Sequence, residues 1–286
     1  MTEETNAKAG GPEPTADKGT VVNVMVAGAL GRMGKLLLGL LSQDPRFLLT
    51  GALESPECPD IGKDVGELSG VGKLGVTLSQ SFPEAAKGAS VYLDFSSPQG
   101  VSQNIVEADI LGVAAVIGVT ALDQVILAQL KEASQRIGVL VAPNMSTGVN
   151  IMYRVAARMA SLLGEDYDIE IVEAHHNRKK DAPSGTAMRL CETICRERDL
   201  DPSKAAVFGR HGMPGPRPKG EIGIHAIRGG DIVGDHTVIF AGPGETLELT
   251  HRAQTRDAFA KGALKAALWM AGRAPGYYSY AEVLGS

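Results

Sequence analysis

The chain has 286 residues, a formal net charge of −5, 44% hydrophobic residues, 21% charged residues and three cysteines. This length exceeds one ordinary core, so we expect two domains, and the composition excludes a disordered or coiled-coil chain. The negative net charge would not attract nucleic acid. Three cysteines without a CxxC pair exclude a disulfide framework and a structural zinc site. No apolar run is long enough to span a membrane. We therefore expect a cytoplasmic protein without nucleic-acid or membrane partners and without a metal site.

After a polar tail, the first half of the chain alternates strands and helices. Residues 1–20 lack an apolar core and an Arg-rich amphipathic face, so they are predicted to be a disordered tail rather than a targeting segment. Apolar runs at 21–27, 47–53, 90–95, 114–119 and 138–143 predict strands, and the stretches 35–41, 101–111 and 122–135 between them predict helices. This rhythm predicts an α/β fold with a Rossmann-type parallel sheet covered on both faces, over residues 21–146.

The second half of the chain follows a different pattern. A long helix near 149–163, a strand at 168–174 and a helix from Ser184 precede three strands at 221–228, 236–241 and 246–253, which no helix separates. Such strands, joined by turns that contain glycine, predict an antiparallel or mixed sheet in a separate α+β domain over 147–256. The final helix, within 257–286, is amphipathic and could pack on either lobe.

A glycine-rich loop lies directly after the first strand and directly before a helix. It is formed by Gly28, Ala29, Leu30, Gly31, Arg32 and Met33, followed by Gly34. Glycines here allow a tight turn and close approach to a pyrophosphate, which then faces the positive end of the helix. Glu54 ends the second strand about twenty residues later, where a carboxylate accepts hydrogen bonds from an adenosine ribose. The loop predicts NADH or NADPH as cofactor, with NADH at least as good because Glu54 would repel a 2′-phosphate.

The segment from Glu173 to Ala187 carries the candidate chemistry. It places His175, His176 and Lys179 between a strand and a helix start. Pro and Ser open helices, so we expect the amides of Ser184, Gly185 and Thr186 to face the site and bind a carboxylate, which favours a dicarboxylate substrate. Neighbouring cations make a lysine a better acid near neutral pH and argue against a cage for a metal ion. His175 and Lys179 are therefore the predicted proton-handling residues.

Read in chain order, GALGRMG, DFSSPQG, APNMSTGVN, EAHHNRKKDAPSGTA and RGGDIVGDHTVIF resemble the dihydrodipicolinate reductase family of lysine biosynthesis, from Val21 nearly to the end. The resemblance implies NAD(P)H-dependent reduction of 4-hydroxy-tetrahydrodipicolinate: loss of water, hydride delivery to C4 and protonation at C3 by Lys179. It implies His175 and Lys179 as the catalytic pair and His176 as a substrate ligand. It also implies that the cofactor is held by the loop, by Glu54 and by two further segments, which are Gly118, Val119 and Thr120, and Ala142, Pro143, Asn144 and Met145.

The resemblance also implies an assembly and shows two departures. The final helix is expected to return to the cofactor lobe, and the second-lobe sheets are expected to form a homotetramer. The family usually has Gly-Thr-Thr-Gly near the nicotinamide, whereas this chain has Gly118-Val119-Thr120-Ala121. Some members have a basic residue after the ribose-binding acid, where this chain has Ser55. Because the two sites lie on different lobes, we expect closure about hinges near Ser146 and Arg256.

Two other readings fit part of the sequence. An amino-acid dehydrogenase related to aspartate dehydrogenase would share a Rossmann lobe and an anion-binding second lobe, but the HH-x-x-K-x-D-A-P-S-G-T string argues against it. A redox-sensing protein would hold the dinucleotide without turnover, and His175 with Lys179 argue against that.

Overall fold

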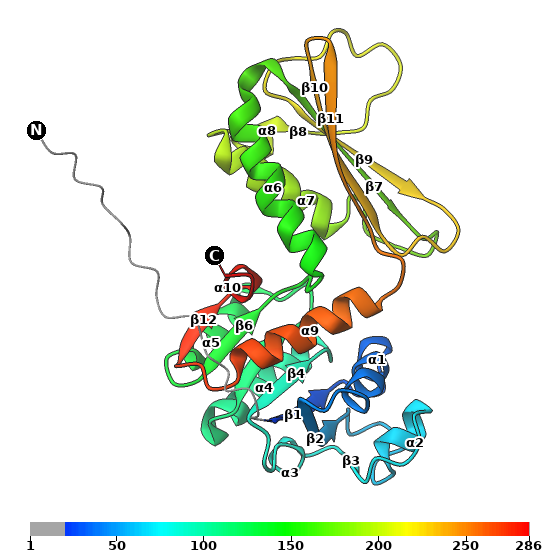
Figure 1. Ribbon diagram of the computed structural model, residues 1–286, viewed down its shortest axis with the longest axis vertical. Helices are drawn as coiled ribbons and strands as arrows, with labels where there is room; N and C mark the ends of the chain where they lie inside the picture. The colour runs from blue at the N-terminus through cyan, green and yellow to red at the C-terminus, as the bar shows by residue number, and fades with distance from the viewer. Residues whose placement is uncertain (1–20, 286) are drawn as a thin grey trace, which may run out of the picture.

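The computed structural model describes residues 21–285, so the predicted tail at 1–20 lies outside the described residues. Two sheets form two halves of the molecule, and the chain crosses between them before α6 and again before α9 (Figure 1). The helices of the first half are α1 (Arg32–Leu41), α2 (Val65–Ser69), α3 (Phe82–Ala85), α4 (Pro98–Leu111) and α5 (Gln124–Ala133). Those after the first crossing are α6 (Thr147–Leu163), α7 (Gly185–Glu197), α8 (Pro202–Ala205), α9 (Asp257–Met270) and α10 (Tyr280–Val283), with a short 3-10 helix at Gly164–Asp166.

A seven-stranded parallel sheet forms the first half. Its spatial order is β12-β6-β5-β4-β1-β2-β3. The strands are β1 (Val22–Ala27), β2 (Phe47–Leu53), β3 (Leu78–Ser79), β4 (Val91–Asp94), β5 (Ala114–Ile117), β6 (Gly138–Val141) and β12 (Gly276–Tyr278). The order reverses between β1 and β4, and in such sheets a ligand binds beyond the carboxyl ends of the strands at that point. The predicted Rossmann-type parallel sheet is confirmed.

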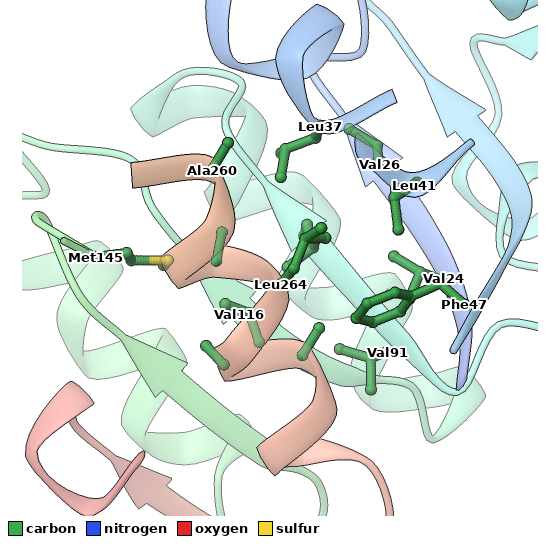
Figure 2. Close-up of a cluster of buried hydrophobic side chains, with 14 of the residues drawn as sticks. Val24, Val26, Leu37, Leu41, Phe47, Val91, Val116, Met145, Ala260 and Leu264 are labelled. Atoms are coloured by element: carbon green, nitrogen blue, oxygen red, sulfur yellow. The ribbon is translucent and has the colours of Figure 1, made fainter. Parts of the chain in front are cut away.

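Helix α9 packs on this sheet although it follows all strands of the other one. Its Ala260 and Leu264 lie in one core cluster with Val24, Phe47 and Val116 from three parallel strands (Figure 2). Burying a side chain such as that of Leu264 contributes about 1.5–3 kcal/mol to stability. The apolar face of α9 therefore holds the chain against the parallel sheet after its second crossing. A Cβ at Gly262 would lie 1.7 Å from the carbonyl oxygen of Met145. Glycine there lets α9 touch the first crossing directly.

A five-stranded mixed sheet forms the second half. Its order is β11-β10-β7-β9-β8, in which β10 runs antiparallel to both neighbours and the other pairs are parallel. The strands are β7 (Asp168–His175), β8 (Ala206–Phe208), β9 (Ile222–Arg228), β10 (Asp235–Gly242) and β11 (Glu245–Arg252). The core beneath it contains side chains of α6 and α7. The predicted mixed sheet is confirmed, while the exact domain boundaries and the hinges stay a prediction.

The elements that the sequence patterns miss are short. β3, β8, β12, α2, α3, α8 and α10 have two to five residues each. Periodicity cannot identify an element that completes hardly more than one helical turn or one strand alternation. Asp64 begins α2 through its side chain, which accepts hydrogen bonds from the amides of Gly66 and Glu67.

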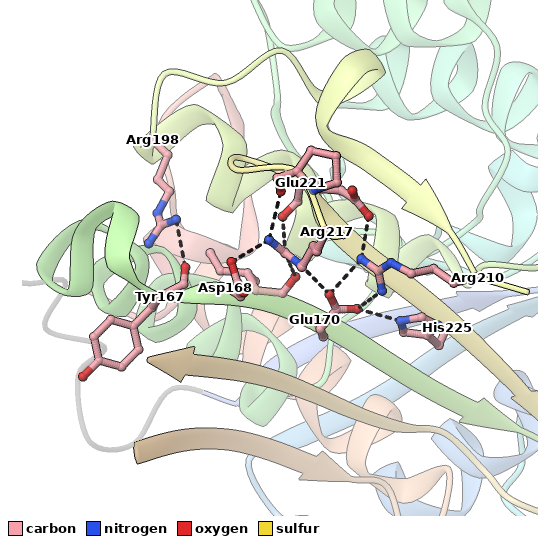
Figure 3. A network of polar contacts seen from close by, with 10 residues as sticks. Tyr167, Asp168, Glu170, Arg198, Arg210, Arg217, Glu221 and His225 are labelled. Carbon is pink, nitrogen blue, oxygen red and sulfur yellow. Dashed lines mark hydrogen bonds and ion pairs between the residues drawn. The ribbon is translucent and has the colours of Figure 1, made fainter. Parts of the chain in front are cut away.

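A polar network surrounds the first residues of β7, at the opposite end of this strand from His175. Glu170 bonds to Arg210, Arg217 and His225 (Figure 3). Burial raises the pKa of Glu170, but these hydrogen bonds outweigh it and lower the value to about 2. Arg217 and its partner Asp168 also line a cavity of about 480 Å³. Because Asp168 and His175 are the two ends of β7, this cavity is not the predicted substrate site.

Candidate active site

The glycine loop has the geometry that a dinucleotide needs. Gly28 lies at the carboxyl end of β1 with φ of 74°, and a Cβ there would meet the Phe95 carbonyl oxygen at 2.7 Å. A Cβ at Gly34 would lie 2.2 Å from the Gly28 oxygen, so the loop closes only with glycine at that position. Gly31 precedes α1 without a side-chain cap, which leaves amides of the first turn for an anion. The residues present therefore fit a pyrophosphate.

Glu54 stands at the loop, but its carboxylate already has partners. One oxygen accepts from the Leu30 amide at 3.0 Å and the other from the Ser55 amide at 3.1 Å. Each carboxylate oxygen has a second lone pair, so Glu54 can still accept from ribose hydroxyls. The structure thus adds a second task to the predicted one, because Glu54 also holds the loop.

The turn after β5 explains one departure from the family pattern. Gly118 packs against the ring of Phe95, where a Cβ would lie 2.2 Å from a ring carbon. Val119 is 8% exposed, so its side chain belongs to the core, while Thr120 is exposed. Ala121 has φ of 58°, in the left-handed region that favours glycine. This backbone conformation explains why the family usually has glycine at position 121. In this chain an alanine adopts the same strained conformation.

The segment Ala142–Met145 carries the first crossing. The Met145 side chain is 2% exposed and buried in the core, so only its backbone can face a cofactor. Ala142 is also buried, while Pro143 is exposed. Asn144 instead reaches the other half of the molecule, because its Nδ2 donates to Thr186 Oγ1 at 3.0 Å. Asn144 thus joins the predicted cofactor segment to the predicted carboxylate site.

His175 ends β7 and is held by a buried carboxylate. Its Nδ1 lies 2.6 Å from Glu173 Oε2, and its ring meets the ring of His236 edge to face at 5.2 Å. Glu173 is fully buried and also pairs with Arg228. Burial raises the pKa of Glu173, but hydrogen bonds from Arg228, His175 and the Ser184 amide outweigh it and leave the pKa lowered. The carboxylate therefore stays charged beside His175.

His176 and Lys179 follow in one tight turn. The Lys179 amide donates to the His176 carbonyl at 3.1 Å, and Lys179 Nζ pairs with Asp181 at 2.8 Å. Burial, then the positive charges of Arg178 and Arg256, lower the pKa of His176. Its Nδ1 is buried without a hydrogen-bond partner. Because Nδ1 is enclosed, Nε2 is the ring nitrogen left for a substrate group, and the role of His176 as a substrate ligand stays a prediction.

The structure corrects the role expected for Ser184. Its amide donates to Glu173 Oε1 at 2.9 Å, and its hydroxyl lies 3.0 Å from His236 Nε2 and accepts from the Ala187 amide. With the side chain 2% exposed, Ser184 has no group left for a substrate carboxylate. Gly185 is exposed at the first position of α7, and the Thr186 hydroxyl is engaged by Asn144 and Tyr153, so the backbone amides of these two residues are the groups left for an anion. These two residues remain as the predicted carboxylate anchor.

The structure adds residues that the sequence patterns did not single out. Arg228 and His236 come from β9 and β10, the two strands that flank β7, and the register sets them opposite His175 and Glu173 respectively. Glu173 and His175 are two residues apart on one strand and therefore share a face. The alternation along β7 could have linked Glu173 to His175 from the sequence. Periodicity could not show that β9 and β10 lie beside β7, so Arg228 and His236 could not be found in this way. Among residues 21–285, no cluster suited to a metal ion occurs and no helix is long and apolar enough to cross a membrane.

His236 makes the stability of the protein depend on pH. Burial lowers the pKa of His236 from 6.5 to about 3. Between these two pH values the imidazole is protonated in the unfolded chain but not in the folded chain. Unfolding is therefore favoured as pH falls, by up to about 1.4 kcal/mol per pH unit. We expect the urea midpoint of His236→Gln to fall less between about pH 7 and about pH 5 than that of the wild type. An equal fall in both proteins would contradict this assignment.

Comparisons with known proteins identify the family of this chain. Residues 22–145 match the family profile "Dihydrodipicolinate reductase, N-terminus" and residues 148–284 match "Dihydrodipicolinate reductase, C-terminus". A 4-hydroxy-tetrahydrodipicolinate reductase of Anaeromyxobacter dehalogenans is 44% identical over 265 residues, which cover 93% of this chain and 98% of the relative. One of Thiobacillus denitrificans is 45% identical over 264 residues, or 92% of this chain and 98% of the relative.

Solved structures share the fold. A dipicolinate-bound dihydrodipicolinate reductase from Paenisporosarcina sp. TG-14 superposes with a TM-score of 0.72 at 22% identity, over 91% of this chain and 98% of the other. GenD2 from gentamicin A biosynthesis, in complex with NAD, gives 0.60 at 15% identity, over 93% and 91%. The resemblance inferred from the motifs is confirmed, and the chain belongs to the dihydrodipicolinate reductase family.

Proposed function

We propose that this chain reduces 4-hydroxy-tetrahydrodipicolinate to tetrahydrodipicolinate with NADH or NADPH, as a step of lysine and diaminopimelate biosynthesis. Family membership makes it an oxidoreductase that uses a pyridine nucleotide. The observation that supports the substrate is the start of α7, which Glu173 links to His175 through the Ser184 amide and which Asn144 links to the cofactor half through Thr186. A dicarboxylate held there lies between a proton donor and the dinucleotide half.

The residues of the chain then have separate tasks. The amides of Gly185 and Thr186 hold one substrate carboxylate, and the His176 imidazole binds a second polar group through Nε2, since its Nδ1 is enclosed. The bound dinucleotide supplies a hydride to C4 after water has left. Lys179 gives a proton to C3, so that one hydride and one proton are added in total, and His175 handles protons beside it. Closure of the two halves excludes water from this transfer.

An absorbance assay separates this activity from the two other readings. We expect NADH to be consumed with freshly prepared 4-hydroxy-tetrahydrodipicolinate and not with oxaloacetate plus ammonia. Consumption only with oxaloacetate and ammonia would indicate an amino-acid dehydrogenase. Dinucleotide binding without consumption in either assay would indicate a sensor.

Cofactor preference is expected to depend on Glu54. We propose that NADH is used at least as well as NADPH, since this carboxylate repels a 2′-phosphate and Ser55 offers no cation. In Glu54→Gln, the ratio of kcat/KM for NADPH to that for NADH should rise by about tenfold, while the side-chain oxygen keeps the Leu30 amide bonded. Glu67→Gln, at an exposed position of α2, is the control and should not change the ratio. An unchanged ratio in Glu54→Gln would remove Glu54 from the phosphate discrimination.

We also propose a homotetramer that works in the cytoplasm. The edge strand β11 supports an assembly, since most of its residues are exposed and Leu247 is 42% exposed. Ile227 on β9 of the same sheet is 50% exposed. Light scattering after size-exclusion chromatography should give four times the mass of the chain, and a monomer mass would reject the assembly. The three free cysteines fit a reducing compartment.

A further inference from the structure

Glu173 contacts both His175 and the Ser184 amide at the start of α7, and no other carboxylate within residues 21–285 is bonded to both. It lies on β7 with no exposed side-chain surface, and a charge in such a place is costly unless every oxygen is paired. Arg228 compensates the charge through two hydrogen bonds of 2.7 and 2.8 Å. This pairing leaves two further contacts, one to His175 and one to Ser184, which the charge balance alone does not require.

The contact with His175 determines which ring nitrogen carries the proton. A carboxylate only accepts, so the 2.6 Å contact requires a hydrogen on His175 Nδ1. In the neutral ring the Nε2 is then an acceptor, and a Cβ added at Gly234 would come within 3.0 Å of it, so glycine at that position leaves room beside this nitrogen. The edge contact with His236 fixes the plane of the same ring. Orientation and tautomer of His175 are thus set from one side.

The contact with Ser184 determines where α7 begins. The Ser184 amide donates to the second oxygen of Glu173 at 2.9 Å, and Ser184 caps the helix through its own hydroxyl. Gly185 and Thr186, the next two residues, form the proposed carboxylate anchor. Any displacement of the Glu173 carboxylate would move the imidazole and this anchor together.

We propose that Glu173 is a positioning residue that sets the tautomer of His175 and, through Ser184, the place of the carboxylate anchor at the start of α7. This role rests on the proposed function for its effect on turnover, although the tautomer does not depend on the substrate. The simpler account is that Glu173 only neutralises Arg228 inside the fold. The two accounts differ in what happens when both members of the ion pair are replaced.

The test uses Glu173→Gln and ¹⁵N-labelled histidine. We expect the wild-type His175 to show a protonated Nδ1 and, in the variant, a shift of the proton to Nε2, because the new amide can donate to Nδ1. His175→Gln assigns the resonance. With the proposed substrate, kcat should fall by about 10- to 100-fold, as when a residue that orients a functional histidine is lost. KM should change by less than about threefold, since glutamine still accepts from the Ser184 amide.

Two further variants make the result decisive. In Glu173→Gln with Arg228→Met no buried charge is left unpaired, so the urea midpoint should recover while kcat stays low, and recovery of kcat would overturn the proposal. The double variant also carries the test if the single one does not fold. Glu170→Gln is the matched control, because Glu170 lies on the same strand and bonds to two arginines and a histidine, yet its kcat should stay near the wild-type value.

The outcomes also separate this proposal from the proposed function. An unchanged His175 spectrum in Glu173→Gln overturns the positioning role, whatever the substrate is. The expected spectral change in a protein that does not reduce 4-hydroxy-tetrahydrodipicolinate would support the positioning of His175 and reject the proposed substrate.

Discussion

Replacing Lys179 with methionine is expected to lower kcat by about 100- to 10,000-fold, which is the range that a positioned general acid contributes. The side chain is only 20% exposed and Nζ lies 2.8 Å from Asp181, so the ammonium is held in place beside His176 rather than extended into solvent. Methionine keeps most of the apolar stem and removes the proton donor. The dissociation constant for NADH should stay within about twofold, since Lys179 lies outside the glycine loop.

The neighbouring lysine provides the control for this prediction. Lys180 is exposed and carries the same charge one position later. Lys180→Met should therefore leave kcat near the wild-type value, and a single-turnover experiment with bound NADH should show the loss in Lys179→Met only. Equal losses of turnover and of dinucleotide binding in Lys179→Met would contradict its role as proton donor.

Replacing Gly34 with alanine is expected to weaken dinucleotide binding by at least about 100-fold, because the new methyl group would displace the loop that cradles the pyrophosphate. The Cβ would lie 2.2 Å from the Gly28 oxygen and 2.4 Å from the Ala29 oxygen, and both are backbone atoms that cannot rotate away. The loop would have to open between β1 and α1. Titration calorimetry with NADH measures this loss directly.

Gly39 on the same helix is a matched control. A Cβ there would have its nearest neighbour, a Val71 side-chain carbon, at 3.7 Å, which is ordinary contact. Gly39→Ala should leave NADH binding unchanged and raise the free energy of unfolding by about 0.5–1 kcal/mol, as alanine favours a helix interior. If Gly34→Ala bound NADH as tightly as Gly39→Ala, the glycine loop would not be the pyrophosphate site.

Much of the first half could be predicted because its signals are local. The mostly apolar run at 47–53 predicts a strand, and Phe47–Leu53 is the strand that the structure contains. The glycine loop could be recognised because one short stretch holds the strand end, the turn and the helix start. Elements such as α2 and β3 were missed, since a few residues give no periodicity.

The expectation for Ser184 was wrong for a different reason. Sequence position made it a helix opener, and it does cap α7 through its hydroxyl. Its amide, however, was expected to be free, whereas it donates a hydrogen bond to Glu173, which lies eleven residues earlier in the chain. A helix start exposes several amides, and only the surrounding fold decides which of them another residue already occupies.

The sequence by itself determined the class of fold, the glycine turn between β1 and α1 and the segment that holds His175, His176 and Lys179, because each of these depends on residues close together in the chain. The tertiary structure alone decided which residues support that segment. The order β10-β7-β9 sets His236 and Arg228 on either side of Glu173 and His175, although they are 52 to 55 positions from their partners Ser184 and Glu173. Strand order follows from how whole apolar faces are buried, and this is a property of the folded chain that no local pattern contains.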